Sequence, residues 1–322
     1  MNKNFLEIQD VTFAASKKNK INNVTFNLEK EGEIICLLGP SGIGKTTILR
    51  SIAGLEKINS GVISINNTIV SSKDIFYPPE KRNIGFVFQD PQTSLNPILT
   101  IGEQLIETIL AHLNLSKEEA KDKAISLLKE VGIKDAENRF DNYPHQFSGG
   151  MRQRAVIAIA LALMPPLIIM DEPTTALDVI VEREILAKII ELRKELGFTI
   201  LFITHDLNLL LEFADRLAIM RHGKVIELGQ TQKIRAGGEH SYTQKLIGAV
   251  PSASGPRKKG LLSKPKNRDF GSTPLLEVQN LSKNFPVSGF FRPKLIEAVK
   301  EISFQVFPGE IVALVGESGS GK

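Results

Sequence analysis

Residues 39–46, GPSGIGKT, place three glycines ahead of a lysine and a threonine, the full pattern of a phosphate-binding P-loop. Glycines let backbone N–H groups converge on one anion, and a helix that begins there adds partial positive charge. The Lys45 ammonium would contact the β- and γ-phosphates of a nucleotide, and the Thr46 hydroxyl suits Mg²⁺. The alternative is a glycine turn that only enters a helix. The predicted nucleotide contacts are Gly39, Pro40, Ser41, Gly42, Ile43, Gly44, Lys45, Thr46 and Thr47.

Two adjacent carboxylates and a histidine follow two further apolar runs. LIIMDEP, residues 167–173, contains Asp171 and Glu172, and ITHD, residues 203–206, contains His205. Buried carboxylates are costly unless their charge is compensated. We expect Mg²⁺ to compensate Asp171, Glu172 to orient and deprotonate an attacking water, and His205 to donate to the γ-phosphate. The alternative for Asp171 and Glu172 is a strand that ends in a polar turn. The alternative for His205 is a structural role.

Hydrophobic spacing predicts the elements that position these residues. The apolar run 34–38 indicates a central parallel strand, and 45–53 continues from the glycine loop as a helix. Residues 167–170 and 200–203 are predicted to be further buried strands, the latter preceded by a helix over 182–196. The carboxyl ends of parallel strands share one edge of a sheet, so the polar groups that follow them should meet there.

A helical region is predicted between the P-loop and the acidic strand end. From Ile101 to Leu113 apolar residues recur every four positions, which marks one face of a helix. Ser116 followed by Glu119 forms a capping box that predicts the start of a second helix. The apolar run 155–170 contains two prolines, so we interpret it as a buried helix followed by a buried strand.

The chain repeats part of itself. LEIQDVTF at 6–13 recurs as LEVQNLSK at 276–283, and GEIICLLGPSGIGK at 32–45 recurs as GEIVALVGESGSGK at 309–322. The second copy is too short to bury a core alone. We therefore predict a first domain, a basic flexible linker and the N-terminal fragment of a second domain that ends within its P-loop, at 1–250, 251–274 and 275–322.

Composition is that of a globular protein, with 42% hydrophobic and 24% charged residues. The net charge of +4 does not indicate a nucleic-acid partner, because six basic residues crowd the predicted linker. A solvated linker is our interpretation, and a nucleic-acid or lipid-headgroup patch is the alternative. The single Cys36 is expected to be a buried core thiol. With no internal disulfide and no signal-peptide pattern, we expect a cytosolic chain whose membrane association comes through partner proteins.

Residues 147–154, FSGGMRQR, resemble the signature motif of the ABC (ATP-binding cassette) family. A glycine pair, the Ser148 hydroxyl and a helix expected over 151–164 would make a second anion site. The resemblance implies that two domains pack head to tail, with ATP between the P-loop of one and the signature of the other. The implied signature contacts are Ser148, Gly149, Gly150 and Met151.

The resemblance covers residues 6–250 and implies an α/β P-loop NTPase of ABC ATPase type. Its expected parts are a RecA-like parallel-sheet core, an N-terminal antiparallel β subdomain and an inserted helical subdomain. Gln89 in FVFQDPQTSLNP resembles the Q-loop glutamine that contacts Mg²⁺ and water, and Asp178 in TALD resembles the D-loop aspartate. The resemblance thus implies Thr46, Gln89 and Asp171 around Mg²⁺, and Glu172, His205 and Gln89 in catalysis.

QDPQTSLNP, YPHQFSGGMRQR, DEPTTALDV and EHSYTQKLIGAVPS are similar to the oligopeptide, dipeptide and nickel importer branch. The resemblance implies an ATPase at the cytoplasmic face of the membrane that drives import of peptides or similar small solutes. Implied partners are permease subunits, a second ABC ATPase domain and, indirectly, an extracytoplasmic solute-binding protein. The rival is a tandem ABC protein acting on ribosomes or DNA, and a third reading is a chain inactive without a partner domain.

One departure from the family concerns the adenine base. The family usually stacks adenine on an aromatic residue ahead of the P-loop. Aligning the two repeats sets Ala15 opposite Phe285, and Phe13 is nearby but out of register. What stacks on adenine in the first site therefore stays open.

Overall fold

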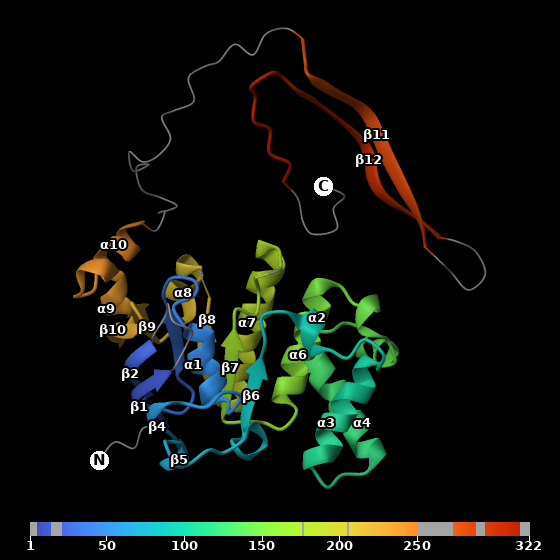
Figure 1. Cartoon of the computed structure of the whole chain (residues 1–322). Coiled ribbons are helices and arrows are strands. Elements are labelled where there is room, and N and C mark those ends of the chain that lie inside the picture. Colours follow the sequence, from blue (N-terminus) through green and yellow to red (C-terminus); the bar gives the residue numbers. More distant parts are fainter. Residues whose placement is uncertain are drawn as a thin grey trace. The chain divides into compact units, whose positions relative to one another are not determined.

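The structure is a computed structural model that describes residues 5–13, 21–175, 177–204, 206–249, 273–287 and 294–315. The chain divides into two compact units, Met1–Val250 and Pro251–Lys322, and each is described by itself (Figure 1). Several sequence predictions lie outside the described residues: those on Ala15, His205, the linker residues up to 272 and the second P-loop copy at 316–322.

A six-stranded sheet forms the centre of the first unit (Figure 1). In spatial order its strands are β10 (Lys224–Gln230), β9 (Arg216–Arg221), β3 (Ile34–Leu38), β8 (Thr199–Ile203), β7 (Leu167–Asp171) and β6 (Ile84–Val87). All neighbours pair in parallel except the edge strand β10. β3, β7 and β8 are buried along their whole length, as expected for parallel strands covered on both faces. The three strand predictions are confirmed.

A four-stranded antiparallel sheet forms a second layer of this unit. Its order is β2 (Ile21–Leu28), β1 (Leu6–Phe13), β4 (Ser60–Ile65) and β5 (Thr68–Ser71). Buried residues on β1 and β2 pack with helix α1 (Lys45–Ile52) and with one face of the central sheet. The expected combination of a parallel core and an antiparallel β subdomain is therefore present. Phe13 is 4% exposed and belongs to this cluster.

The helices that follow α1 lie between the later strands of the central sheet and after its last strand in the chain. They are α2 (Pro91–Ser94), α3 (Ile101–His112), α4 (Lys117–Glu130), α5 (Ala136–Arg139), α6 (Gly149–Leu161), α7 (Val179–Leu196), α8 (Leu207–Phe213), α9 (Thr231–Arg235) and α10 (Ser241–Ala249), with single turns at Pro79–Lys81 and Pro144–Gln146. The capping box of Ser116 and Glu119 is confirmed at the start of α4. Helices α2 to α6 form the inserted helical region.

The signature helix differs from the prediction at both ends. Helix α6 begins at Gly149, because the Ser148 side chain accepts a hydrogen bond from the Met151 N–H and caps the first turn. The helix ends at Leu161 instead of Met164, whose φ is +49°. Pro165 disfavours helical geometry in the residue before it, which accounts for the earlier end.

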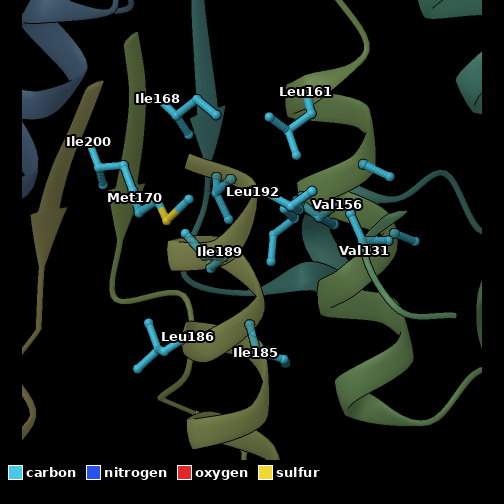
Figure 2. Packing of buried hydrophobic residues seen from close by; sticks show 14 of the residues in the cluster. Val131, Val156, Leu161, Ile168, Met170, Ile185, Leu186, Ile189, Leu192 and Ile200 are labelled. Atoms are coloured by element: carbon cyan, nitrogen blue, oxygen red, sulfur yellow. The ribbon is translucent and has the colours of Figure 1, made fainter. Parts of the chain in front are cut away.

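The opposite faces of the central sheet belong to two separate cores, because side chains alternate along each strand. Figure 2 shows the first core, in which Ile168 and Met170 of β7 lie near Val156 and Leu161 of α6 and a row of apolar residues on α7. Cys36 also belongs to this core and is a free thiol with no exposed surface, as predicted. Burial raises the pKa of this thiol.

The second unit is described as a two-stranded antiparallel sheet of β11 (Leu276–Val287) and β12 (Lys294–Val306). Its irregularities repeat those of β1 and β2. Asp10 and Asn280 both have φ of +47°, and their N–H groups donate to Thr25 Oγ1 and Ser303 Oγ respectively, both at 2.9 Å. The internal sequence repeat thus folds into the same bulged hairpin twice. Across the described part of the chain, we find no helix long and apolar enough to cross a membrane.

Candidate functional site

The P-loop joins β3 to α1 in a conformation that requires glycine. Gly42 and Gly44 have φ of +74° and +102°, in the left-handed region that other residues rarely adopt. A Cβ on Gly39 would lie 2.8 Å from the carbonyl oxygen of Met220, so the loop also passes too close to β9 for a side chain. Gly44 provides no side-chain cap to α1. The loop therefore has the close backbone and helix N-terminus of an anion site.

Lys45 holds its charge inside the loop. Its Nζ donates to the carbonyl oxygens of Gly39 and Pro40, at 2.8 and 3.1 Å, and the residue is only 8% exposed. Burial lowers the pKa of this ammonium, while the charges of Glu172 and Asp171 act in the opposite direction. A buried cation beside two carboxylates is suited to a polyanionic ligand that arrives with a divalent cation.

Thr46 and Asp171 bring the P-loop helix to the end of β7. The Thr46 hydroxyl donates to Asp171 Oδ1 at 3.2 Å, and Asp171 is 6% exposed. Burial raises the pKa of Asp171 and the neighbouring charge of Glu172 acts in the same direction, whereas the Thr46 hydrogen bond and Lys45 lower it. A cation at this carboxylate would offset the cost of burying its charge.

The oxygen atoms at this place fit Mg²⁺. A hydroxyl, a carboxylate and the Gln89 amide are hard donors of the kind that this ion prefers. Within the described ranges no group of three or more His, Cys, Asp or Glu residues could hold a metal ion. Mg²⁺ usually takes one or two carboxylates from a protein and completes its shell with waters and substrate phosphates. The side chains that would hold it are Thr46 and Asp171, which contact each other, and Gln89, which contacts the adjacent Glu172.

Glu172 is fixed by groups from three strand ends. Its φ is +47°, and its N–H donates to the carbonyl oxygen of Ile203 in β8 at 2.9 Å. Its carboxylate oxygen Oε2 accepts from Gln89 Nε2, just after β6, at 3.1 Å and from Thr175 Oγ1 at 2.9 Å. A non-glycine residue in this backbone region costs energy and is typical of functional sites. The strand ends thus converge as the sequence predicts.

The signature residues stand at the start of α6, and Asp178 stands at the start of α7. Asp178 caps α7 by accepting from the Val181 N–H at 3.0 Å. A Cβ on Gly150 would lie 2.5 Å from Val181 Cγ1, so a side chain there would displace Val181 where α6 packs on α7. A pocket lined by Gln89, Gly149 and Leu177 connects the Q-loop, the signature and the D-loop.

The two predicted anion sites lie in different parts of the first unit. The P-loop follows β3 in the middle of the central sheet, and α6 packs against the edge strand β6. Two strands, β8 and β7, separate β3 from β6. The structure therefore brings the P-loop together with Asp171, Glu172 and Gln89, and places the signature apart from the P-loop.

Two residues of the first unit make contacts that sequence reasoning did not predict. Thr175 follows Glu172 by three positions, a spacing at which a hydroxyl in a turn can return to the earlier side chain, so a signal existed. Arg82 had no such signal. It is 4% exposed, and within the described part of the chain its guanidinium donates to neutral oxygens, two of which are the Ser51 and Ile52 carbonyls at the end of α1.

A strand, glycine loop and helix with acidic strand ends and a capped glycine signature define an ATP-binding cassette. The family model described as ABC transporter matches residues 21–175. A solved dimer of the ATP-binding cassette MJ0796 bound to ADP and Pi is 32% identical, with a TM-score of 0.61 over 70% of this chain and 98% of that one. The chain belongs to the ABC transporter family, and the expected fold class is confirmed.

Further relatives agree with this assignment. The cbiO1 structure from Clostridium perfringens, part of the ABC transporter complex cbiONQ, is 28% identical, with a TM-score of 0.64 over 73% of this chain and 91% of that one. The glutathione import ATP-binding protein GsiA is 36% identical in Escherichia coli K12 and 37% in Escherichia coli O1:K1. Each match covers 94% of this chain and 53% of the relative, so the chain spans about half the length of these curated relatives.

Proposed function

We propose that this protein is an ATP-binding and ATP-hydrolysing subunit of an ABC importer for oligopeptides, dipeptides or similar small solutes such as glutathione or nickel. The observation that carries the proposal is one connected cluster: Lys45 in the P-loop, the hydrogen bond from Thr46 to Asp171, and Glu172 held by Gln89. Similarity to GsiA, a glutathione import ATP-binding protein, supports the importer part.

The residues have separable tasks in hydrolysis. Lys45 and the loop N–H groups bind the β- and γ-phosphates and hold the γ-phosphorus in place. Glu172 orients a water and accepts its proton as the water oxygen attacks the γ-phosphorus. The bond between the γ-phosphorus and the oxygen that bridges the β- and γ-phosphates breaks, which leaves ADP and phosphate. Mg²⁺, when bound by Thr46, Asp171 and Gln89, supplies charge neutralisation at the phosphates. His205, as a donor to the γ-phosphate, stays a prediction.

The proposed assembly follows from the separation of the two anion sites. A second ABC domain would supply its Ser148-equivalent signature to this P-loop, either within a longer chain or from a second copy. The bulged hairpin of β11 and β12, which repeats β1 and β2, supports residues 275–322 as the start of such a domain, after a linker at 251–274. We further propose permease subunits, a peripheral position at the cytoplasmic face of the membrane and an indirect solute-binding protein.

Glu172→Gln tests the ATPase proposal in the full chain. The amide keeps the shape of the side chain and cannot take a proton, so binding of MgATP should persist while turnover falls at least about a hundredfold. Lys45→Ala should instead lose most of the binding, since a charge-assisted contact to phosphate is removed. Fluorescent-nucleotide titration and phosphate release measure the two quantities. Hydrolysis by Glu172→Gln at the unmodified rate would show that Glu172 is not the base.

A further inference from the structure

Thr175 makes two hydrogen bonds to Glu172 across a single turn. Its N–H donates to the Glu172 carbonyl oxygen at 3.3 Å, and its hydroxyl donates to Glu172 Oε2 at 2.9 Å. The first bond fixes the backbone of the turn, and the second fixes the side chain that leaves from it. A glutamate has three side-chain torsions, so such a contact removes rotamers that a water-activating carboxylate must not occupy.

The same carboxylate oxygen receives a second donor from a different part of the chain. Gln89, which follows β6, donates to Oε2 at 3.1 Å, while Thr175 approaches from the turn that follows β7. Two donors on one oxygen from separate strand ends set the direction of the whole carboxylate. Gln89 lies 83 positions from Glu172 in the chain and Thr175 lies three, so Thr175 is the local member of the pair.

The surroundings of Thr175 indicate a positioning role. The residue is exposed, and a hydrogen bond between exposed groups contributes little to the stability of the fold. The neighbouring Thr174 differs, since it is 3% exposed and its hydroxyl donates to Glu182 in α7. One threonine therefore ties the turn to a helix, and the next directs the carboxylate.

We propose that Thr175 is a positioning residue for hydrolysis, which holds the Glu172 carboxylate toward the attacking water through its hydroxyl. The inference rests on the proposed function of Glu172. A mispositioned base slows the chemical step and leaves the phosphate contacts of the P-loop intact. Loss of the hydroxyl should therefore change turnover and not nucleotide affinity.

The test compares Thr175→Val, Thr175→Ser and Thr174→Val in the full chain. Thr175→Val keeps the shape of the side chain and removes the donor, so kcat should fall about tenfold while KM and the Kd for MgATP change less than about twofold. Thr175→Ser restores the hydroxyl and should recover kcat to within about twofold. Thr174→Val should lower the melting temperature and keep kcat when assayed below that temperature.

The outcomes separate this inference from the proposal on which it rests. If Glu172→Gln abolishes turnover but Thr175→Val keeps the full kcat, or if the serine variant is as slow as the valine variant, Thr175 has no positioning role. If Glu172→Gln itself retains turnover, the role of Glu172 is wrong and the inference falls with it. A drop in kcat for Thr175→Val that serine reverses, with unchanged Kd, supports the inference.

Discussion

The Thr46 hydroxyl, on the first turn of α1, donates to Asp171 Oδ1 at the end of β7 over 3.2 Å. The two residues are 125 positions apart in the chain, so this contact exists only because β3 and β7 end at the same edge of the sheet. Each of these side chains also has an oxygen atom that can be a ligand of Mg²⁺. The contact thus marks the place where phosphate binding and Mg²⁺ binding would meet.

Thr46→Val should weaken nucleotide binding only where Mg²⁺ takes part. Valine keeps the volume of the side chain and removes the oxygen, so affinity for ATP should fall at least about tenfold with Mg²⁺ present and less than about threefold with a chelator. Thr46→Ser should restore the Mg²⁺-dependent part. Titrations with and without magnesium measure this. An equal loss under both conditions would show that the hydroxyl does not serve the cation.

Arg82 should be important for stability and should not tolerate lysine. Its guanidinium donates five hydrogen bonds in three directions, and burial lowers its pKa to about 10. The acceptors are the carbonyl oxygens of Ser51, Ile52, Val70 and Tyr77 and the Ser71 hydroxyl. Arg82→Met should lower the free energy of unfolding by about 3 kcal/mol or more, because buried acceptors lose their partners.

Arg82→Lys separates the effect of the guanidinium hydrogen bonds from the effect of the positive charge. A lysine ammonium reaches fewer of the acceptors than a planar guanidinium, so roughly half of the loss should remain. Two of the contacts cap α1 at the end opposite the P-loop, and the variants should therefore also bind nucleotide more weakly. Urea unfolding followed by circular dichroism measures the stability. A lysine variant as stable as the parent would mean that the charge alone matters.

Glu227 should make the attachment of α10 dependent on pH. Its carboxylate accepts from the N–H groups of Glu239 and His240, at 2.7 and 3.0 Å, and from the Thr243 hydroxyl. Partial burial raises the pKa of Glu227, but these hydrogen bonds outweigh it and hold the pKa below its usual value of 4.5. A depressed carboxyl pKa stabilises the folded state above the unfolded value, and this contribution is lost as pH falls through the folded pKa.

The expected result is a loss of α10 protection at acid pH. Amide hydrogen exchange of α10, corrected for intrinsic rates, should speed up as pH falls below about 4.5. Glu227→Gln should expose α10 at neutral pH and remove most of the pH dependence. Glu239→Gln is the matched control, because the Glu239 backbone N–H donor and the Glu227 carboxylate are both kept. A parent and a Glu227→Gln variant with the same pH response would rule out this carboxylate.

Sequence reasoning succeeded where local chemistry decides the structure. The apolar runs of β3, β7 and β8 have no periodicity because both faces of the sheet are covered, and the cap of α4 depends on residues three positions apart. The P-loop glycines are also recognisable in the sequence, because the loop needs backbone angles and close backbone contacts that other residues rarely allow. These features of the sequence predict that Asp171 and Glu172 lie close to Lys45.

The rest depends on contacts between distant segments. Arg82 is charged and would be expected on the surface, and only the joint packing of α1 and β5 supplies its acceptors. The left-handed backbone of Glu172 is compensated by Ile203 of another strand. Gly150 was interpreted as an anion contact, and its closeness to Val181 could not be known without the packing of α6 on α7.

Under the proposed function, the separation of the P-loop from the signature predicts that ATP hydrolysis needs two ABC domains. β3 carries the P-loop, and α6 lies beside β6 beyond two intervening strands, so one cassette would supply only half of each proposed ATP site. At dilute concentration the rate of hydrolysis by the full chain should therefore rise faster than linearly with enzyme, if two chains pair head to tail. A specific activity independent of concentration would contradict pairing between copies.

Mixing inactive variants tests the same geometry directly. Lys45→Ala chains keep the signature, and Ser148→Arg chains keep the P-loop and Glu172, so a mixed pair contains one complete site. If pairing is random, an equal mixture should recover roughly a quarter of the parent activity. A mixture of Lys45→Ala and Glu172→Gln should recover none, because both changes fall on the P-loop half of the site and each mixed pair has two defective sites. Equal recovery in both mixtures, or none in the first, would contradict a site completed by the partner's signature.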